Sequence, residues 1–306
     1  MKAKAIVKIC ICGTIALVLA SILVSLLALP RVLDWKSGDL SLHWIDDHGS
    51  DEGYTVGEAS VSGEVRELDV SWLSGSVTVE LTDGDAVTLR EEPQPESSDA
   101  RMRWKLQDGK LTVYSQKSGL TIPTRAKQLT IGIPAGRAGK LQKLSLDLSA
   151  ATASLPALTL RELELDSVSG SVTLTGGAYE KLDFDSTSGD LTVTDAAVGE
   201  LSADTTSGSL TLDGAFETVD FDTTSGALHL TTSILPQDIS CDTVSGGVTL
   251  TLPENGGFSA TLDSVSGDLT VDGFAGSLHR DEFVYGQGGP AYEFDSVSGD
   301  VHIRCA

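Results

Sequence analysis

The chain has 306 residues, a length that suits one large domain or two small ones. Aromatic residues make up only 5% of it, which argues against a core of large rings, whereas 32 glycines fit a regular stack of small and β-branched residues. The formal charge is −23, and residues 158–306 hold 25 acidic residues against 4 basic ones, so nucleic-acid binding is excluded because phosphate backbones carry the same sign.

The first predicted element is a transmembrane helix. Residues Ile9 to Leu29 form an uncharged apolar run of 21 residues, long enough to cross a bilayer, and Pro30 ends it. Three lysines precede the run, at Lys2, Lys4 and Lys8. Residues 1–36 are therefore predicted to be a cytoplasmic tip and membrane anchor. This places the protein in the cell membrane with a single pass and its C-terminal domain outside.

A cleaved signal peptide is the alternative for the same segment. Val18-Leu19-Ala20 is an acceptable cleavage site, but the apolar run continues nine residues beyond it. That length favours an anchor that is not cleaved. Both interpretations export the rest of the chain.

Two regions precede the strongest pattern of the sequence. Residues 37–64 are predicted to be a juxtamembrane stalk, acidic and rich in glycine, with a short strand around Leu40–Ile45. Residues 65–157 are predicted to be an N-terminal β region that includes the first rungs of a solenoid. Within it, the alternation across residues 102–114 predicts a β-hairpin that turns at Asp108-Gly109.

A repeated element, Asp-(Ser/Thr)-x-Ser-Gly, dominates residues 158–306. It occurs seven times, at spacings of 18–21 residues and one final spacing of 32, with a degenerate copy at residues 146–150. The seven aspartates are Asp166, Asp185, Asp204, Asp222, Asp242, Asp263 and Asp295. Apolar residues alternate with polar ones on both sides of each copy, as in strands with one buried face.

These repeats predict an all-β fold, a parallel β-solenoid (β-helix) of about 19-residue rungs behind the transmembrane helix. Stacked rungs bury apolar side chains that one rung cannot bury alone. A third recurring apolar position, at Tyr179, Val198, Phe216, Leu235 and Phe258, suggests three sides per turn. The hydroxyl residue after each Asp is expected to face inward, and the corner glycines are expected to supply positive φ angles.

An insertion at residues 273–292 lengthens the last spacing. It contains Arg280, Phe283 and Tyr285 and a run of glycines. It is predicted to cap the open end of the solenoid, because exposed strand edges need cover. A binding loop formed by Arg280, Phe283 and Tyr285 is the alternative.

Tandem rungs of this motif behind one apolar segment resemble the bacterial "putative adhesin" domain of unknown function, which also occurs in LiaG-like membrane-anchored envelope stress proteins. The resemblance covers about residues 65–306. It implies a β-solenoid in the bacterial cell envelope, and it offers no catalytic residue that carries over to this chain.

The seven repeat aspartates form the sharpest chemical feature, because stacked rungs would place their carboxylates about 4.8 Å apart. One interpretation is a ladder of Ca²⁺ sites between rungs, since hard cations take carboxylate oxygens. The other is that each Asp caps its own turn through backbone N–H groups. The turn cap is favoured, because the nonapeptide typical of calcium-binding solenoids is absent from the sequence, and no other cofactor is expected.

Nothing in the sequence indicates an enzyme. Repeated, equivalent, exposed acids lack the two distinct environments that acid–base catalysis needs, and the five histidines occur in no metal-ligand spacing. Cys241 and Cys305 are predicted to be buried free thiols, with a disulfide between them as the alternative.

The predicted function is that of a membrane-anchored extracellular β-solenoid that binds or adheres at the cell surface without catalysis. Its expected partners are the membrane, through the N-terminal helix, and an envelope polymer or another protein. A structural or regulatory component of the cell envelope, active in the stress response, is the alternative. An exposed apolar or aromatic patch near residues 273–292 would favour binding, and a fully capped polar solenoid would favour the structural role.

Overall fold

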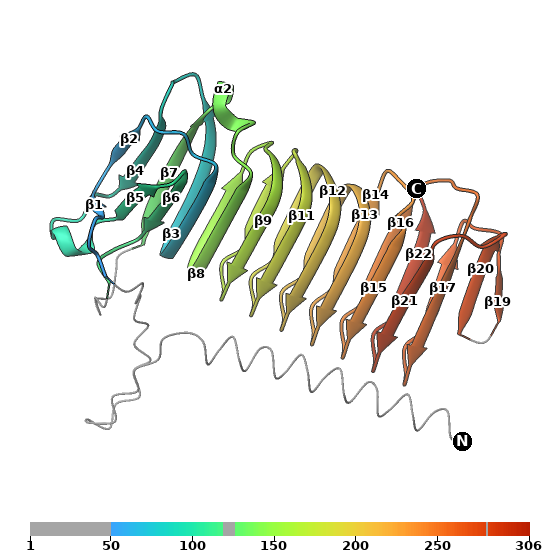
Figure 1. Cartoon of the computed structure of the whole chain (residues 1–306). Helices are drawn as coiled ribbons and strands as arrows, with labels where there is room; N and C mark the ends of the chain where they lie inside the picture. The colour runs from blue at the N-terminus through green and yellow to red at the C-terminus, as the bar shows by residue number, and fades with distance from the viewer. Residues whose placement is uncertain (1–49, 119–125, 280) are drawn as a thin grey trace, which may run out of the picture.

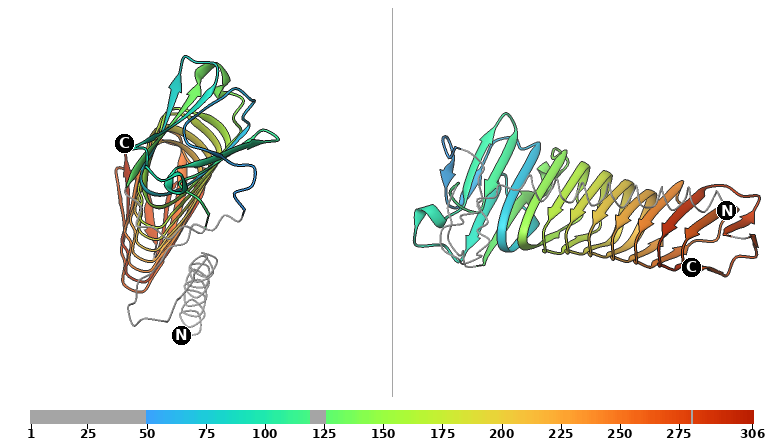
Figure 2. Two further views of the ribbon diagram at one scale, coloured as in Figure 1. Left: turned by 90° about the vertical axis from the view of Figure 1, so that its left-hand side faces the viewer. Right: turned by 90° about the horizontal axis from the view of Figure 1, so that it is seen from below.

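The computed structural model describes residues 50–118, 126–279 and 281–306. In this part of the chain, successive turns of strand stack side by side into one elongated solenoid (Figure 1). Seen along the stack, the turns superimpose as one narrow loop (Figure 2). The predicted all-β fold with parallel stacked rungs is therefore confirmed for these residues.

The middle of the solenoid consists of parallel strands in register. Strand β12 shows one rung: Leu191–Thr194 forms one side, a kink follows, and the segment ending at Thr205 forms the opposite side. The strands of this part are β8 (Lys143–Leu155), β9 (Thr159–Ser167), β10 (Val172–Thr175), β11 (Ala178–Ser186), β12 (Leu191–Thr205), β13 (Leu210–Thr223), β14 (Leu228–Thr232), β15 (Asp238–Thr243) and β16 (Val248–Leu252).

Equivalent apolar residues form continuous columns inside the solenoid. Leu163 pairs with Leu182 and Leu182 with Leu201 in adjacent rungs, and all three are fully buried. Each such side chain contributes about 1.5–3 kcal/mol of hydrophobic stabilisation. The polar residues between them face outward, which is the period-two alternation that the sequence predicts. The predicted third apolar position is also buried at Tyr179, Val198, Phe216 and Phe258, and Leu235 is partly buried.

The last two rungs do not stack in sequence order. Strands β21 (Ala291–Ser296) and β22 (Val301–Cys305) lie between β15–β16 and the rung formed by β17 (Gly257–Ser264) and β18 (Leu269–Asp272). Along the sequence, β17 and β18 thus form the outermost rung first, and β21 and β22 then form the rung between it and β15–β16. This is the one place where two successive repeats, those of Asp242 and Asp263, are not direct neighbours.

The insertion at residues 273–292 explains this order. It forms a hairpin of β19 (Ser277–His279) and β20 (Glu282–Gly286), and β20 pairs antiparallel with the outer edge of β17. The hairpin therefore covers half of the terminal rung and sends the chain back inward (Figure 1).

A thicker cap closes the N-terminal end. Strand β3 (Glu67–Thr82) lies on β8, and β6 (Lys110–Tyr114) and β7 (Lys127–Pro134) lie on β3. Antiparallel strands extend this layer outward: β5 (Arg103–Gln107) on β6, β4 (Val87–Glu92) on β7, β1 (Thr55–Val56) on β5, and β2 (Ala59–Val61) on β4. Helix α2 (Ala135–Ala138) and the 3-10 helix η1 (Ser98–Ala100) complete it.

The predicted hairpin of residues 102–114 is confirmed as β5–β6. Its turn residues Asp108 and Gly109 have φ angles of 53° and 86°. These are the left-handed conformations that an Asp-Gly hairpin turn requires.

The predicted transmembrane helix is corrected. Within residues 50–118, 126–279 and 281–306, no helix is long and apolar enough to cross a bilayer. The α-helix in this part, α2, has four residues, or about 6 Å against a hydrocarbon thickness of about 30 Å. On this finding, two predictions are wrong: the transmembrane helix in the fold class, and the single-pass location in the cell membrane. The segment on which both rested, Ile9 to Leu29, lies outside the described residues, as do the cleavage site and the strand around Leu40–Ile45.

An acidic face as the candidate functional site

The repeat aspartates line up along one edge of the solenoid. Asp166 pairs with Asp185, Asp185 with Asp204, and Asp204 with Asp222 in successive rungs. We call the complete column the aspartate ladder; in spatial order it consists of Asp147, Asp166, Asp185, Asp204, Asp222, Asp242, Asp295 and Asp263. All seven predicted aspartates belong to it, and Asp147 from the degenerate copy extends it.

A second outward column runs beside the ladder. Because side chains alternate along a strand, the residue two positions before each ladder aspartate also faces outward. This second column consists of Ser145, Glu164, Asp183, Ser202, Asp220, Ser240, Glu293 and Thr261. The two columns together form what we call the acidic face. A shallow depression of about 320 Å³ lies within it, lined by carboxylates from three neighbouring rungs.

The corner that follows each aspartate is held by hydroxyl groups. The N–H of Gly189 donates to Ser186 Oγ at 2.7 Å, and the N–H of Gly226 donates to Thr223 Oγ1 at 2.8 Å. The same bond recurs at Ser167, Thr243, Ser264 and Ser296. The hydroxyl residue after each Asp is buried at six of the seven corners, so its predicted inward orientation is confirmed there.

The aspartates do not cap these corners. In the second repeat of the series, the N–H groups of Thr187 and Ser188 donate to Ser167 O and Val168 O of the adjacent rung at 3.0 Å each. The Ser188 hydroxyl also donates to Val168 O. The donors that a capping carboxylate would accept are therefore already used between rungs.

Close approach, rather than a positive φ angle, explains the corner glycines. A Cβ at Gly189 would lie 2.1 Å from Gly170 O, and one at Gly208 would lie 2.1 Å from Gly189 O. The seven motif glycines are absent from the residues with positive φ angles. The expected reason for glycine was therefore wrong: each one lies directly on the carbonyl of the rung beneath it.

Burial and then repulsion from neighbouring carboxylates raise the pKa of six ladder carboxyls. Desolvation by the surrounding face, followed by repulsion from neighbouring carboxylates, raises the pKa of Asp166, Asp185 and Asp242 to about 6 and that of Asp222 to about 7. The same causes raise the pKa of Asp204, Asp220 and Asp295. Protons therefore offset part of the repulsion along the ladder near neutral pH.

A group of three carboxylates close enough to share a metal ion lies beside the ladder, not on it. Glu162, Glu164 and Asp183 bring oxygens within 4.8 Å of one another. Lys143 Nζ lies 2.6 Å from Glu164 Oε1, and Lys181 Nζ lies 2.7 Å from Asp183 Oδ2. Because lysine ammonium groups already balance these acids, the residues do not fit a resident calcium ion.

The aromatic residues of the insertion form the interior of the C-terminal cap. Phe283 is 5% exposed and Tyr285 is partly buried, and the rings of both lie within 6 Å of the Phe258 ring. Phe274 packs edge-on against Phe258. Of the three residues of the predicted binding loop, Phe283 and Tyr285 therefore face the cap interior, and Arg280 lies outside the described residues. Cys241 is a buried free thiol, and Cys305 is a partly buried one.

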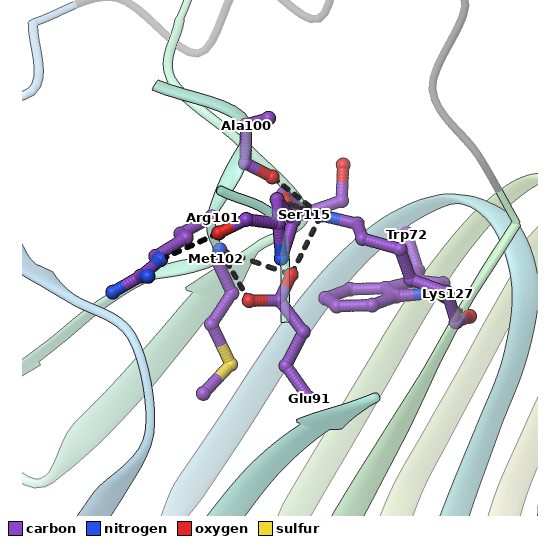
Figure 3. Close-up of polar contacts among 8 residues, drawn as sticks. Trp72, Glu91, Ala100, Arg101, Met102, Ser115 and Lys127 are labelled. Carbon is purple, nitrogen blue, oxygen red and sulfur yellow. Dashed lines mark hydrogen bonds and ion pairs between the residues drawn. The ribbon is translucent and has the colours of Figure 1, made fainter. Parts of the chain in front are cut away.

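One charged site that the sequence does not predict lies inside the N-terminal cap. Lys127 Nζ is 2.7 Å from Glu91 Oε1 and 2.8 Å from Ala100 O, and it also donates to Ser115 O (Figure 3). The Glu91 carboxylate accepts the N–H of Met102. The side chains of Lys127 and Glu91 are 4% and 1% exposed. Neither lies in a motif, so no sequence signal pairs two charges 36 residues apart.

The chain is similar to one protein family and to several solved structures. Residues 65–304 match the family described as Toastrack DUF4097, which confirms the resemblance carried by the repeated motif. No curated protein matches the chain. A "putative lipid binding protein" from Parabacteroides distasonis is similar at 14% identity and a TM-score of 0.46, covering 83% of this chain and 97% of that one. A "putative adhesin" from Bacteroides fragilis is similar at 13% identity and a TM-score of 0.41, covering 83% and 98%.

Proposed function

The chain belongs to the Toastrack DUF4097 family, and from this premise we propose that it is a non-catalytic binding module of the cell surface whose acidic face receives a cationic partner. The observation that carries the proposal is the aspartate ladder: eight carboxylates in one straight column on a scaffold of paired rungs. The partner class is an extended polymer or protein segment with repeated positive charges.

The regular spacing of the face supports an extended partner. Neighbouring rungs lie about 4.8 Å apart, so a chain that lies along the ladder meets an equivalent carboxylate at each step. The scaffold is already ordered, because the corners are fixed by hydroxyl and inter-rung hydrogen bonds. Binding therefore needs little further ordering of this protein, which favours affinity.

Charge also supports this partner class. A cation on the ladder displaces protons or relieves repulsion among carboxylates whose pKa values are raised. Attraction to a face of one sign speeds association and weakens as salt increases. We therefore expect tighter binding at low ionic strength and at pH values above 7.

The equivalence of the acids supports the absence of catalysis in this proposal. Asp166, Asp185 and Asp242 share one environment and one direction of pKa shift, with the same causes. Acid–base chemistry requires two carboxyls whose environments separate their pKa values.

The test is binding of a fluorescent peptide of about twelve lysines to the full chain, measured by anisotropy at several salt concentrations. The face variant is Asp185→Asn/Asp204→Asn/Asp222→Asn. The matched control is Asp213→Asn/Glu217→Gln/Glu254→Gln, which removes three charges from exposed positions outside the acidic face. We expect the face variant to bind at least about fivefold more weakly than the control.

Equal weakening by both variants would show that only net charge matters and would contradict the proposal. Absence of binding to the unmodified chain would favour the alternative, a structural or regulatory component of the cell envelope.

A further inference from the structure

The C-terminal end of the solenoid is only half covered. The outer edge of β17 pairs with β20, whereas β18 pairs with β22 and with no other strand among the described residues. At the N-terminal end, by contrast, both halves of β3 carry further strands, β6 and β7. One four-residue strand edge, Leu269–Asp272, is therefore left open.

Core positions are exposed along this edge. Leu269 and Val271 occupy the positions that Val301 and Ile303 occupy in the adjacent rung, yet they are partly exposed, whereas Val301 is 2% exposed and Ile303 fully buried. Val265, at the corner of the same rung, is 56% exposed. The apolar interior thus ends here without a complete lid.

The hydrogen-bond ladder between rungs also stops at this strand. In five successive rungs, the first apolar residue after the corner donates its N–H to a carbonyl of the next rung: Leu191 to Ser209, Leu210 to Ala227, Leu228 to Gly247, Val248 to Asp300 and Val301 to Asp268. Leu269 is the next residue of this series, and no acceptor follows it in the described part of the chain.

Alternation along the strand defines which backbone groups face outward. Because Asp268 O accepts from Val301, Thr270 points its N–H and C=O toward β22. Leu269 and Val271 therefore point their N–H and C=O groups away from the solenoid. Four strong hydrogen-bonding groups lie beside two half-exposed apolar side chains.

We propose that the outer edge of β18 is a docking site for an extended segment of a partner protein, which adds to the solenoid as one more strand. The segment alternates apolar and basic residues. Its apolar side chains cover Leu269 and Val271, and its backbone continues the ladder. This site lies apart from the acidic face and is independent of the function proposed for that face.

Charge selects basic residues for the other face of the added strand. Strand β18 ends at Asp272 and is preceded by Asp268, and residues 257–272 contain no lysine, arginine or histidine. Asp272 is 67% exposed, with His302 Nε2 at 2.8 Å. An added strand with basic residues next to these carboxylates gains favourable cross-strand pairs.

The same charges argue against a second copy of this chain as the occupant. Antiparallel pairing of two β18 edges would place Asp268 of one copy opposite Asp272 of the other. Like charges directly opposite each other destabilise a strand pair. The exposed aspartates thus protect the edge from self-association while they favour a basic partner.

The test uses the full chain and a fluorescent peptide of about ten residues that alternates lysine and valine. Its controls are a peptide of the same composition with all valines before all lysines, and a peptide that alternates glutamate and valine. Anisotropy measures affinity, and amide hydrogen exchange reports the N–H groups of Leu269 and Val271. We expect only the alternating basic peptide to protect these two amides from exchange.

Val271→Pro removes an outward N–H without touching the bonds to β22, and is expected to weaken binding at least about tenfold. Thr270→Lys, an exposed change that keeps the backbone, is expected to weaken it by electrostatic repulsion, whereas Val271→Thr is expected to retain it. The face variant Asp185→Asn/Asp204→Asn/Asp222→Asn is expected to leave the protection of the Leu269 and Val271 amides by this peptide unchanged.

Equal protection of the Leu269 and Val271 amides by the block peptide, or full binding by both Val271→Pro and Thr270→Lys, would overturn the proposal. Protection of Leu269 that rises with protein concentration without peptide would also overturn it, because the occupant would then be a second copy.

Discussion

The corner glycines allow the rungs to stack closely because they carry no Cβ. Six of the seven face the carbonyl oxygen of the glycine in the adjacent rung, and a Cβ there would lie only 1.8–2.1 Å from that oxygen; Gly170 faces the carbonyl oxygen of Ala151. The clash is with backbone, which is itself held between two other rungs. Neither partner can move without breaking hydrogen bonds on both sides.

We therefore expect Gly208→Ala to destabilise the chain by about 1–3 kcal/mol or more through overpacking against Gly189 O. Chemical denaturation followed by circular dichroism measures the change. Gly139→Ala is the control, because a Cβ at Gly139 meets no atom within 4 Å and its φ angle is −67°. Equal stability of the two variants would contradict the stacking argument.

The buried ion pair of the N-terminal cap carries a second prediction. Lys127→Met leaves the Glu91 carboxylate, 1% exposed, without its cationic partner, so we expect a loss of about 3–5 kcal/mol. The double variant Lys127→Met/Glu91→Gln removes both charges and should recover part of that loss. A double variant as unstable as Lys127→Met in urea denaturation would show that lost packing, not the unpaired charge, is the cause.

The sequence predicts the residues of the candidate site better than it predicts their roles. Period and motif identify all seven repeat aspartates and the inward hydroxyls, because these depend on local alternation. They misassign the turn cap to the aspartates, since the choice between carboxylate and hydroxyl depends on where the adjacent rung supplies carbonyls. The pair of Lys127 and Glu91 depends on long-range packing and leaves no local signal.

At the scale of whole strands, the order of rungs is the feature that periodicity does not encode. Every rung carries the same motif, so β17 matches β15 as well as β21 does. The hairpin β19–β20 decides the order, because it turns the chain back toward the gap. The same equivalence of rungs explains why the sequence predicts the strands but not the position of the last rung.

Deletion of residues 291–306 tests this arrangement. It removes the rung that joins β15–β16 to β17–β18, together with the bond from Tyr292 Oη to Pro236 O. Because each rung contacts only its neighbours, we expect rapid amide exchange in residues 257–290 while β9 to β13 remain protected. Exchange of the N-terminal cap in the same sample is the internal control.

Persistent protection of β17 after the deletion would have a different meaning. It would show that β17 pairs directly with β15 when the gap is vacated, with Asp263 next to Asp242. The order of rungs would then be a consequence of the hairpin's length rather than a requirement for stability.

At the scale of the molecule, negative charge accumulates along the whole solenoid, and calcium is the simplest ion that would offset it. The structure supplies other means: lysines beside Glu164 and Asp183, and protons on the ladder. We therefore expect the melting temperature of the full chain to be the same in millimolar calcium and in EDTA. A rise with calcium that disappears in the variant Asp185→Asn/Asp204→Asn/Asp222→Asn would contradict this and restore the calcium ladder.

Stability should depend on pH in the direction opposite to that of a salt-bridged protein. The pKa is raised to about 6 for Asp166, Asp185 and Asp242 and to about 7 for Asp222 in the folded chain, against about 4 when unfolded. Between these values the folded state binds more protons than the unfolded state, so the free energy of unfolding falls as pH rises. The stabilising contribution is complete below about pH 4 and is lost as pH rises through 6 and 7.

We expect the full chain to melt about 5 °C or more higher near pH 5 than near pH 8, given roughly 2–4 °C per kcal/mol at this size. Asp222→Asn should raise the melting temperature at pH 8 and change it little at pH 5, because it removes a charge that is disfavoured by burial and then by repulsion from Asp242, Asp204 and Asp220. Asp213→Asn, an exposed change outside the acidic face, is the control. A melting temperature that rises from pH 5 to pH 8 would mean that the ladder carboxylates are stabilised in their charged form by some other group, and the argument from like-charge crowding would fail.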